Sequence, residues 1–374
     1  MSAHLEIGMD KWGISTPALL IDLDVMEKNI SEMVRYFKSV RASLRPHTKI
    51  HYSPIIARKQ LDVGGIGICC HTVGETEVMA SSGINNILIT NEIVGRDKIE
   101  RLINVSGNTD VIVAVDNPEN AEDLSAAALK KGLVQDVLLD LNIGLARCGV
   151  LPGKSALSLA KKIVKLRGLR LRGIMGYHSK HEKDFQKRKE VSEKMLRGNL
   201  ETKELLEKNG IRVDILSGGC TNNYNIVAEY PGMTEVQAGT YVFMDLNNSE
   251  IVGTTPADLN FALTVLTTVI SRPTQDRAVV DAGRKAIAES PLGYAPKPKD
   301  IEGVELYAEH AEHGLLRLDS PSKEIKVGDK LELIVAYCDG TVNLWRQFCG
   351  IRNGRLEAIL PIHHYGLPGW ARPS

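Results

Sequence analysis

The chain has 374 residues, of which 43% are hydrophobic and 25% charged, ordinary values for a soluble protein of one or two domains. Lysine plus arginine and aspartate plus glutamate both number 46, so the charge balance indicates neither a nucleic-acid nor an acidic-membrane partner. The sequence shows no apolar run long enough to span a membrane, no secretory signal pattern and no C-x-x-C pair among its six cysteines. We therefore expect reduced thiols and a cytoplasmic location.

Short apolar runs alternate with amphipathic stretches from residue 17 to about 245. Amphipathic stretches at 25–40, 154–165 and 190–209 predict helices. The expected strands are 18–22, 44–47, 67–70, 87–90, 110–115, 137–141, 171–177, 213–217 and 235–238. This alternation predicts a parallel sheet, and the number of repeats favours a closed (β/α)₈ barrel. A doubly wound open sheet is the alternative, but the G-x-G-x-x-G turn expected after its first strand is missing.

The pattern changes after Asp245, where helical periodicity fades and β-rich runs separated by turn signals take over. The expected strands here are 261–270, 277–281, 330–336, 344–351 and 355–361. The sequence therefore predicts an α/β plus β fold: a TIM-like (β/α)₈ barrel at residues 17–250 and an antiparallel β domain. The β domain takes residues 1–16 and 251–374, completes the active site, and ends in an irregular tail at 366–374.

Lys49 ends the segment Arg45-Pro46-His47-Thr48-Lys49, directly after an early expected strand. In barrels of this type the chemistry lies at the carboxyl ends of the strands. A lysine there can lose its charge by desolvation and condense with an aldehyde. An isolated lysine is more often a surface residue, so the interpretation depends on the loops that follow later expected strands.

Glycine-rich loops after two late strands complement that lysine. Adjacent glycines let backbone N–H groups approach an anion, and late barrel loops commonly hold phosphate, although Gly-Gly is more often a tight turn. The candidate phosphate contacts are Ser217, Gly218, Gly219, Thr221, Gly239, Thr240 and Tyr241. A reactive lysine and a phosphate loop together indicate pyridoxal 5′-phosphate as the cofactor.

Two further expected strands end in polar side chains. Arg147 follows the strand at 137–141, and its guanidinium could hold the cofactor's phenol oxygen ionised. Tyr177 and His178 close the strand at 171–177 and place a phenol and an imidazole at the same rim. Each of these residues is also compatible with ordinary packing or a surface position.

Taken together, these segments resemble the alanine racemase-like pyridoxal-phosphate enzymes, specifically the D-threonine aldolase and D-serine dehydratase group. The resemblance covers nearly the whole chain, and implies that Lys49 binds the cofactor covalently, Arg147 faces its phenol oxygen and Tyr177 contacts its pyridine nitrogen. It also implies a homodimer. The matching segments are 16–22, 45–49, 90–95, 147–150, 217–219, 237–245, 280–283, 312–314 and 339–344.

One segment departs from the group's pattern. The group carries a metal-binding histidine followed two residues later by aspartate or cysteine, whereas this chain has Tyr337-Cys338-Asp339. Asp339 matches a ligand, but a neutral phenol is a poor ligand for Zn²⁺ or Mn²⁺ at pH 7. Either a histidine elsewhere completes the site, or the metal is absent, or the substrate lacks a β-hydroxyl. We favour metal loss over rescue by a histidine; the candidates are His178, His181, His363 and His364.

A second departure follows Tyr177, where Lys180, His181 and Lys183 make the loop more charged than in the group. These charges could attract an acidic substrate, but we favour a charged surface segment exposed to solvent. Cleavage of Cα–Cβ needs a base for the β-hydroxyl, and His51 or His178 could serve; Tyr337 could act as acid or base. We expect an aldolase that cleaves a D-β-hydroxy-α-amino acid, D-threonine-like or 3-hydroxyaspartate-like, to glycine and an aldehyde. A dehydratase, ammonia-lyase or racemase on this scaffold and a non-catalytic cofactor carrier are the alternatives.

Overall fold

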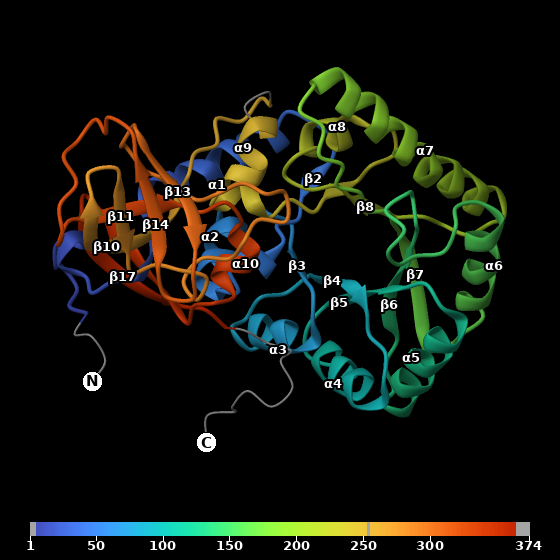
Figure 1. Ribbon diagram of the computed structural model, residues 1–374. Helices are drawn as coiled ribbons and strands as arrows, with labels where there is room; N and C mark the ends of the chain where they lie inside the picture. The colour runs from blue at the N-terminus through green and yellow to red at the C-terminus, as the bar shows by residue number, and fades with distance from the viewer. Residues whose placement is uncertain (1–4, 253–254, 364–374) are drawn as a thin grey trace. The chain divides into compact units, whose positions relative to one another are not determined.

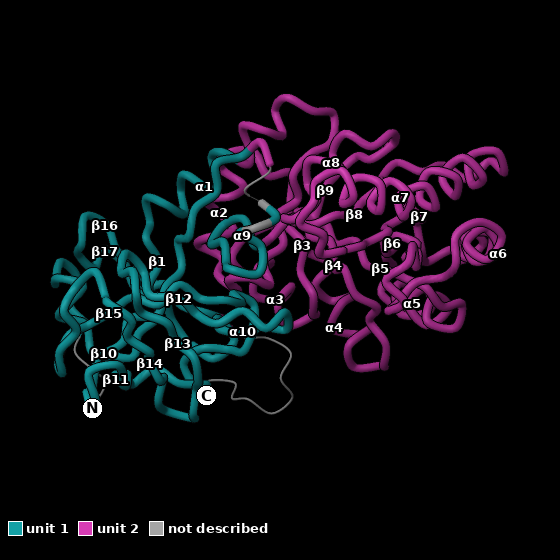
Figure 2. Tube along the Cα trace, turned by 45° about the horizontal axis from the view of Figure 1, so that its top comes forward, with its two compact units in different colours: residues 1–32, 240–253, 257–362 teal, residues 33–239, 254–256, 363–374 magenta. Residues whose placement is uncertain are grey.

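The computed structural model describes residues 5–252 and 255–363. Within these ranges the chain forms two compact units, which Figure 2 shows in different colours. Unit 2 contains residues 33–239, and unit 1 contains the residues up to 32 together with 240–252 and 257–362. Helix α1 (Leu23–Phe37) begins in unit 1 and ends in unit 2.

Unit 2 is built on a parallel sheet of eight strands in the described part of the chain, in the order β2-β9-β8-β7-β6-β5-β4-β3. A parallel bridge between His47 and Cys69 joins its two edge strands, so the sheet closes into a barrel (Figure 1). The strands are β2 (Ser43–Leu44), β3 (Ile68–Cys70), β4 (Ile87–Glu92), β5 (Val111–Val115), β6 (Gln135–Asp140), β7 (Leu169–Met175), β8 (Ile215–Gly218) and β9 (Glu235–Val236). The predicted (β/α)₈ architecture is confirmed.

Helices follow the strands and cover the outside of this barrel (Figure 1). They are η2 (Thr48–Ile50), α2 (Pro54–Asp62), α3 (Val73–Ser81), α4 (Arg96–Ser106), α5 (Pro118–Lys130), α6 (Lys154–Ile163), α7 (Phe185–Lys208) and α8 (Tyr224–Glu229). Ile68 and Ile87 pack against Ala57 of α2 and Met79 of α3. Because side chains alternate along a strand, the next residues in register form the barrel interior. That interior cluster contains Cys69, Leu88, Ile112, Ala114, Leu138 and Met175.

Unit 1 contains a nine-stranded sheet among its described residues, with the path β13-β14-β11-β10-β1-β16-β17 and β15 paired to β10 and β12. Its strands are β1 (Ala18–Asp22), β10 (Leu263–Thr274), β11 (Arg277–Val280), β12 (Lys297–Pro298), β13 (Val304–Glu309), β14 (Gly314–Leu318), β15 (Lys330–Ile334), β16 (Gln347–Arg352) and β17 (Arg355–Pro361). Its helices are η1 (Lys11–Gly13), η3 (Thr240–Val242), α9 (Leu246–Val252) and α10 (Cys338–Val342). The sheet is antiparallel except where β1 pairs with β16.

Three expectations differ from the structure. The strand at 18–22 forms, but its placement in the barrel was wrong, because β1 pairs with β10 and β16 in the sheet of unit 1. Strands β12, β13 and β14 had not been expected. The all-antiparallel character of the second domain also needs correction, since β1 and β16 run parallel. The predicted irregular tail at 366–374 lies outside the described residues.

The described helices include none that is both long and apolar enough to cross a membrane. All six cysteines lie in the described ranges and are free thiols, and burial raises the pKa of the Cys69, Cys70 and Cys338 thiols well above the ordinary value.

Candidate active site

Lys49 lies in the short helix η2, after strand pairing has ended. Backbone pairing with the β9 segment extends past the end of β2: the Arg45 N–H donates to the Val236 carbonyl and the His47 N–H to the Ala238 carbonyl, both at 3.0 Å. The chain then turns, so the Lys49 side chain leaves from the carboxyl end of the strand, where it is partly buried. This is the position that the sequence predicted for the reactive amine.

The charge of Lys49 acts on three buried groups from separate parts of the barrel. Burial is the largest cause in each case: it lowers the pKa of His47, raises that of Glu75 to about 7 and raises that of Cys220 to about 11. The charge of Lys49 contributes to the pKa shifts of all three groups, and one of them, Cys220, lies in the loop that follows β8. Lys49 is therefore within electrostatic reach of Cys220, the residue that follows the twin glycines.

Arg147 and Tyr177 lie against each other at the same end of the barrel. The guanidinium carbon is 5.2 Å from the centre of the Tyr177 ring, a cation–π contact. Burial raises the pKa of Cys220; a backbone hydrogen bond with Asn222, the charge of Lys49 and a hydrogen bond with Tyr177 oppose that rise, in this order. Lys49, Arg147 and Tyr177 thus form one connected group with Cys220.

The loop that carries Arg147 is fixed by side chains from neighbouring strands. Asn142 Oδ1 accepts from the N–H groups of Gly144 and Ala146, both at 3.1 Å, and Asp116 Oδ2 accepts from Gly149 N at 2.9 Å. Gly149 has a φ of +95°, and a Cβ there would come within 2.5 Å of the Asn142 nitrogen. The loop needs glycine at this position to close back onto β6.

Three carboxyl groups at the ends of β4, β5 and β6 lie beside this loop. Burial, then the charge of Glu92 and a hydrogen bond with it, then the charge of Asp116 together raise the pKa of Asp140 to about 8. Arg147 acts in the opposite direction. The sequence interpretation missed this cluster, although each acid stands at or just after the end of a buried strand, which is a readable signal.

The loops predicted to hold phosphate contain glycines that their surroundings require. Gly219 has a φ of +74°, and a Cβ on Gly218 would come within 2.3 Å of the Gly176 carbonyl oxygen. A Cβ on Gly239 would lie 3.0 Å from the His47 oxygen, next to the Lys49 segment. The Ser217 hydroxyl already accepts from Gln237 Nε2 at 2.7 Å, and Thr221 is buried.

The two predicted histidine bases differ in their surroundings. His51 is fully buried, its Nδ1 accepts from Ser53 N at 2.9 Å and its Nε2 lies 3.1 Å from Gln60 Oε1, so the ring supports the start of α2. Burial lowers the pKa of His51 and of His178 to about 4. His178 follows Tyr177 and packs its ring against Asn223, which places it in the same loop group as the twin glycines.

Tyr337, Asp339, Thr240 and Tyr241 belong to unit 1. Tyr337 precedes α10 and is partly buried; burial, followed by the charges of Asp339 and Asp245, raises the pKa of its phenol to about 12. Such a phenol keeps its proton at neutral pH and does not fit a divalent-metal site. Across 5–252 and 255–363, no three His, Cys, Asp or Glu side chains form a metal-binding group.

Three histidines besides His178 were considered as replacements for the metal ligand that is absent at Tyr337. His181 is exposed in the loop after β7, together with Lys180 and Lys183. The backbone N–H of His363 donates to the Tyr52 oxygen at 3.0 Å. His364 lies outside the described residues.

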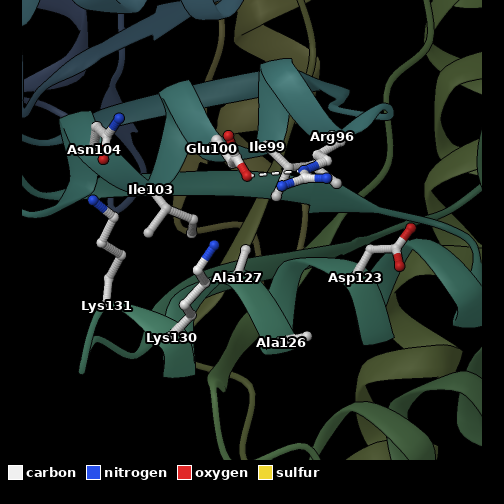
Figure 3. Close-up of a pocket in the computed structure, with 10 residues that line it drawn as sticks. All are labelled: Arg96, Ile99, Glu100, Ile103, Asn104, Asp123, Ala126, Ala127, Lys130 and Lys131. Carbon is white, nitrogen blue, oxygen red and sulfur yellow. Dashed lines mark hydrogen bonds and ion pairs between the residues drawn. The ribbon is translucent and has the colours of Figure 1, made fainter.

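A groove on the outside of the barrel, between α4 and α5, contains none of these residues (Figure 3). Its walls include Ile99 and Ile103 of α4, the lysines at 130 and 131, and an ion pair between Arg96 and Glu100 at 3.1 Å. The groove is lined by residues of two outer helices, and none of the residues grouped around Lys49 contributes to it.

A closed parallel barrel with a lysine, an arginine and glycine loops at its strand ends, joined to a separate mixed sheet, defines the alanine racemase-like class. The chain belongs to this family: residues 21–247 match the alanine racemase N-terminal domain, and residues 262–351 match a serine dehydratase domain.

Curated relatives within the family include aldolases, dehydratases and alanine racemases. The chain is 34% identical to a 3-hydroxy-D-aspartate aldolase of Paracoccus denitrificans, over 96% of this chain and 94% of that protein. It is 33% identical to a D-threonine aldolase of an Arthrobacter species, over 94% and 93%. Among solved structures, D-threonine aldolase from Filomicrobium marinum has a TM-score of 0.93 at 34% identity, covering 97% of this chain and 98% of that one.

Proposed function

We propose that the protein is a pyridoxal-phosphate-dependent aldolase that cleaves a D-β-hydroxy-α-amino acid to glycine and an aldehyde. The observation that carries the proposal is the grouping of Lys49, Arg147, Tyr177 and the Gly218–Gly219 turn at one end of the barrel. Relatives at 33–34% identity over nearly the full chain are named for cleavage of D-threonine and 3-hydroxy-D-aspartate, which supports this reaction class.

The residues present fit the cofactor. Gly219 has a left-handed φ of +74°, and Gly239 lies too close to the His47 carbonyl oxygen to carry a side chain, so both turns need glycine. The backbone N–H groups of these turns would hold the phosphate. Lys49 would form the covalent link, and Arg147 would neutralise the phenol oxygen. Pyridoxal phosphate, when bound, supplies an electron-accepting ring that weakens the bonds at Cα of an amino acid.

The chain's own groups would then decide which bond at Cα breaks. Burial lowers the pKa of His178 to about 4, so its ring is neutral at pH 7 and would accept the β-hydroxyl proton as a weak base. Tyr337 stands where the D-threonine aldolase and D-serine dehydratase group carries a metal-binding histidine, and its phenol would donate a hydrogen bond to the substrate. Removal of hydroxide without a metal is difficult, and this favours aldol cleavage over dehydration.

The deciding experiment incubates the cofactor-loaded protein with a panel of D-amino acids that includes D-threonine and 3-hydroxy-D-aspartate. Glycine, ammonia and inversion at Cα are measured together, with the exposed Lys98→Ala variant as the control for Lys49→Ala. We expect stoichiometric glycine and aldehyde, lost only in Lys49→Ala. Ammonia as the main product would establish a dehydratase, and inversion at Cα would establish a racemase. If no amino acid of the panel is converted, the result favours the cofactor carrier.

The finer properties belong to the same proposal. Metal-independent catalysis is supported by the protonated Tyr337 phenol. A homodimer is supported by the family resemblance, and light scattering will test it. A cytoplasmic location is supported by six free cysteines, and fractionation of cells that produce the protein will test it.

A further inference from the structure

Glu75 is a buried acid near Lys49 with two separate sets of contacts. It occupies the third position of α3, and the Thr72 side chain accepts from its N–H at 3.1 Å. Glu75 Oε2 accepts in return from His71 N at 2.7 Å, and the carboxyl group also accepts from the Thr72 backbone. This reciprocal capping of the helix start accounts for one carboxyl oxygen.

The other oxygen, Oε1, contacts the segment that carries Lys49. Glu75 Oε1 lies 2.5 Å from the Thr48 hydroxyl, which also lies 2.8 Å from the Cys69 carbonyl oxygen. A hydroxyl has one proton, and a carboxylate and a carbonyl are both acceptors, so Thr48 cannot donate to both. Both short contacts become hydrogen bonds if Glu75 is a neutral acid that donates to Thr48 while Thr48 donates to Cys69.

The surroundings favour the neutral form. Glu75 is 1% exposed and Thr48 0%. The titratable groups that face the carboxyl are the Lys49 ammonium and the thiols of Cys69 and Cys70. Burial is the largest influence and raises the pKa of Glu75 to about 7, against the opposing effects of its hydrogen bonds and of Lys49.

We propose that Glu75 is a positioning residue that, as a neutral acid, holds Thr48 and thereby fixes Lys49 in η2 for attachment of the cofactor. The proposal depends on the proposed function for the role of Lys49. The hydrogen-bond chain itself runs from Glu75 through Thr48 to Cys69, and it can be tested in the protein without cofactor.

The first test is infrared spectroscopy of the cofactor-free protein between pH 5 and 9. We expect a buried carboxylic-acid C=O band in the difference spectrum between wild type and Glu75→Gln, from which the band of Asp140 cancels because both proteins contain it. This difference band should be present at pH 6, titrate near neutrality and shift when Thr48→Val is introduced. The control is Glu119→Gln, which changes an exposed glutamate in the first turn of α5. A band absent at pH 6, or unchanged in Glu75→Gln, overturns the proposal whatever the enzyme's activity.

The second test is cofactor affinity, followed by absorbance. Glutamine keeps a donor toward Thr48 and can still cap α3, so Glu75→Gln should bind within about threefold of the wild type, whereas Thr48→Val should lose about tenfold or more. Thr48→Ser is the matched control and should bind normally. A Glu75→Gln protein that keeps its fold but binds as weakly as Thr48→Val shows that the charged form is needed, and contradicts the proposal. Loss of the proposed function would appear separately, as unchanged cofactor binding in Lys49→Ala.

Discussion

The buried ion pair between Arg45 and Glu235 offers the sharpest prediction about how the Lys49 segment is held. Arg45 Nε and Nη2 lie 2.9 and 2.8 Å from the two carboxyl oxygens of Glu235, and both side chains are 3% exposed. Arg45 Nη1 also donates to the Asn86 carbonyl and side-chain oxygens. The pair therefore ties the segment before Lys49 to β9 and to the start of β4.

Replacing Arg45 by methionine leaves the Glu235 carboxylate buried without its partner. Removing one member of a buried pair costs about 3–5 kcal/mol, far more than the pair's net contribution, because the remaining charge has lost its water and gained nothing. The double variant Arg45→Met/Glu235→Leu removes both charges. It should recover at least about 2 kcal/mol relative to the sum of the single variants.

The assay is urea denaturation followed by far-ultraviolet circular dichroism, in a double-mutant cycle with Glu235→Leu. The exposed pair Arg96–Glu100, on the outer helix α4, is the control and should change stability by less than about 1 kcal/mol. If Arg45→Met behaves like the exposed pair, or the double variant loses the full sum, the argument from a desolvated pair is refuted.

Three further predictions concern the site. Gly210→Ala, at φ of +77° with open space around the new Cβ, should lose about 1 kcal/mol of stability and leave cofactor binding unchanged. Gly219→Ala, at φ of +74° with Val227 3.0 Å from the new Cβ, should lose more stability and also weaken cofactor binding in an absorbance titration. Burial raises the pKa of Glu75 from its ordinary value of 4.5 to about 7. Its protonation therefore adds stability that is complete below pH 4.5 and is lost as the pH rises to about 7, by up to about 1.4 kcal/mol per pH unit. Glu75→Gln should remove this pH dependence of the unfolding free energy, measured by denaturation at several pH values. Exhaustive chelation should leave turnover unchanged, whereas activity lost and restored by Mn²⁺ contradicts metal loss.

The barrel could be predicted because its signals are local. Each parallel strand reads as a short apolar run, and each helix has a repeating apolar face, so β3 to β8 lie within a few residues of the expected ranges. The β1–α1 segment has the same local pattern but pairs with β10 and β16, because pairing partners depend on tertiary contacts. Strand β13 alternates buried and exposed residues from Val304, a period-two signal that the sequence interpretation did not use.

The site was predictable where chemistry requires a residue type at a strand end, as for Lys49 and Arg147. The contacts of Glu75 were not, because its capping pattern Thr72-Val73-Gly74-Glu75 predicts only a helix start. Its second contact, to Thr48, joins residues 27 positions apart and exists only once the barrel closes. The same holds for the carboxyl cluster of Glu92, Asp116 and Asp140.

Borohydride reduction of the cofactor-loaded protein, followed by peptide mass spectrometry, tests the central claim most directly, since reduction makes a cofactor–lysine link permanent. We expect the mass of a phosphopyridoxyl group on Lys49, and an unmodified peptide in a sample reduced without cofactor. A label on another lysine, or no label on a protein that shows cofactor absorbance, contradicts the assignment of Lys49.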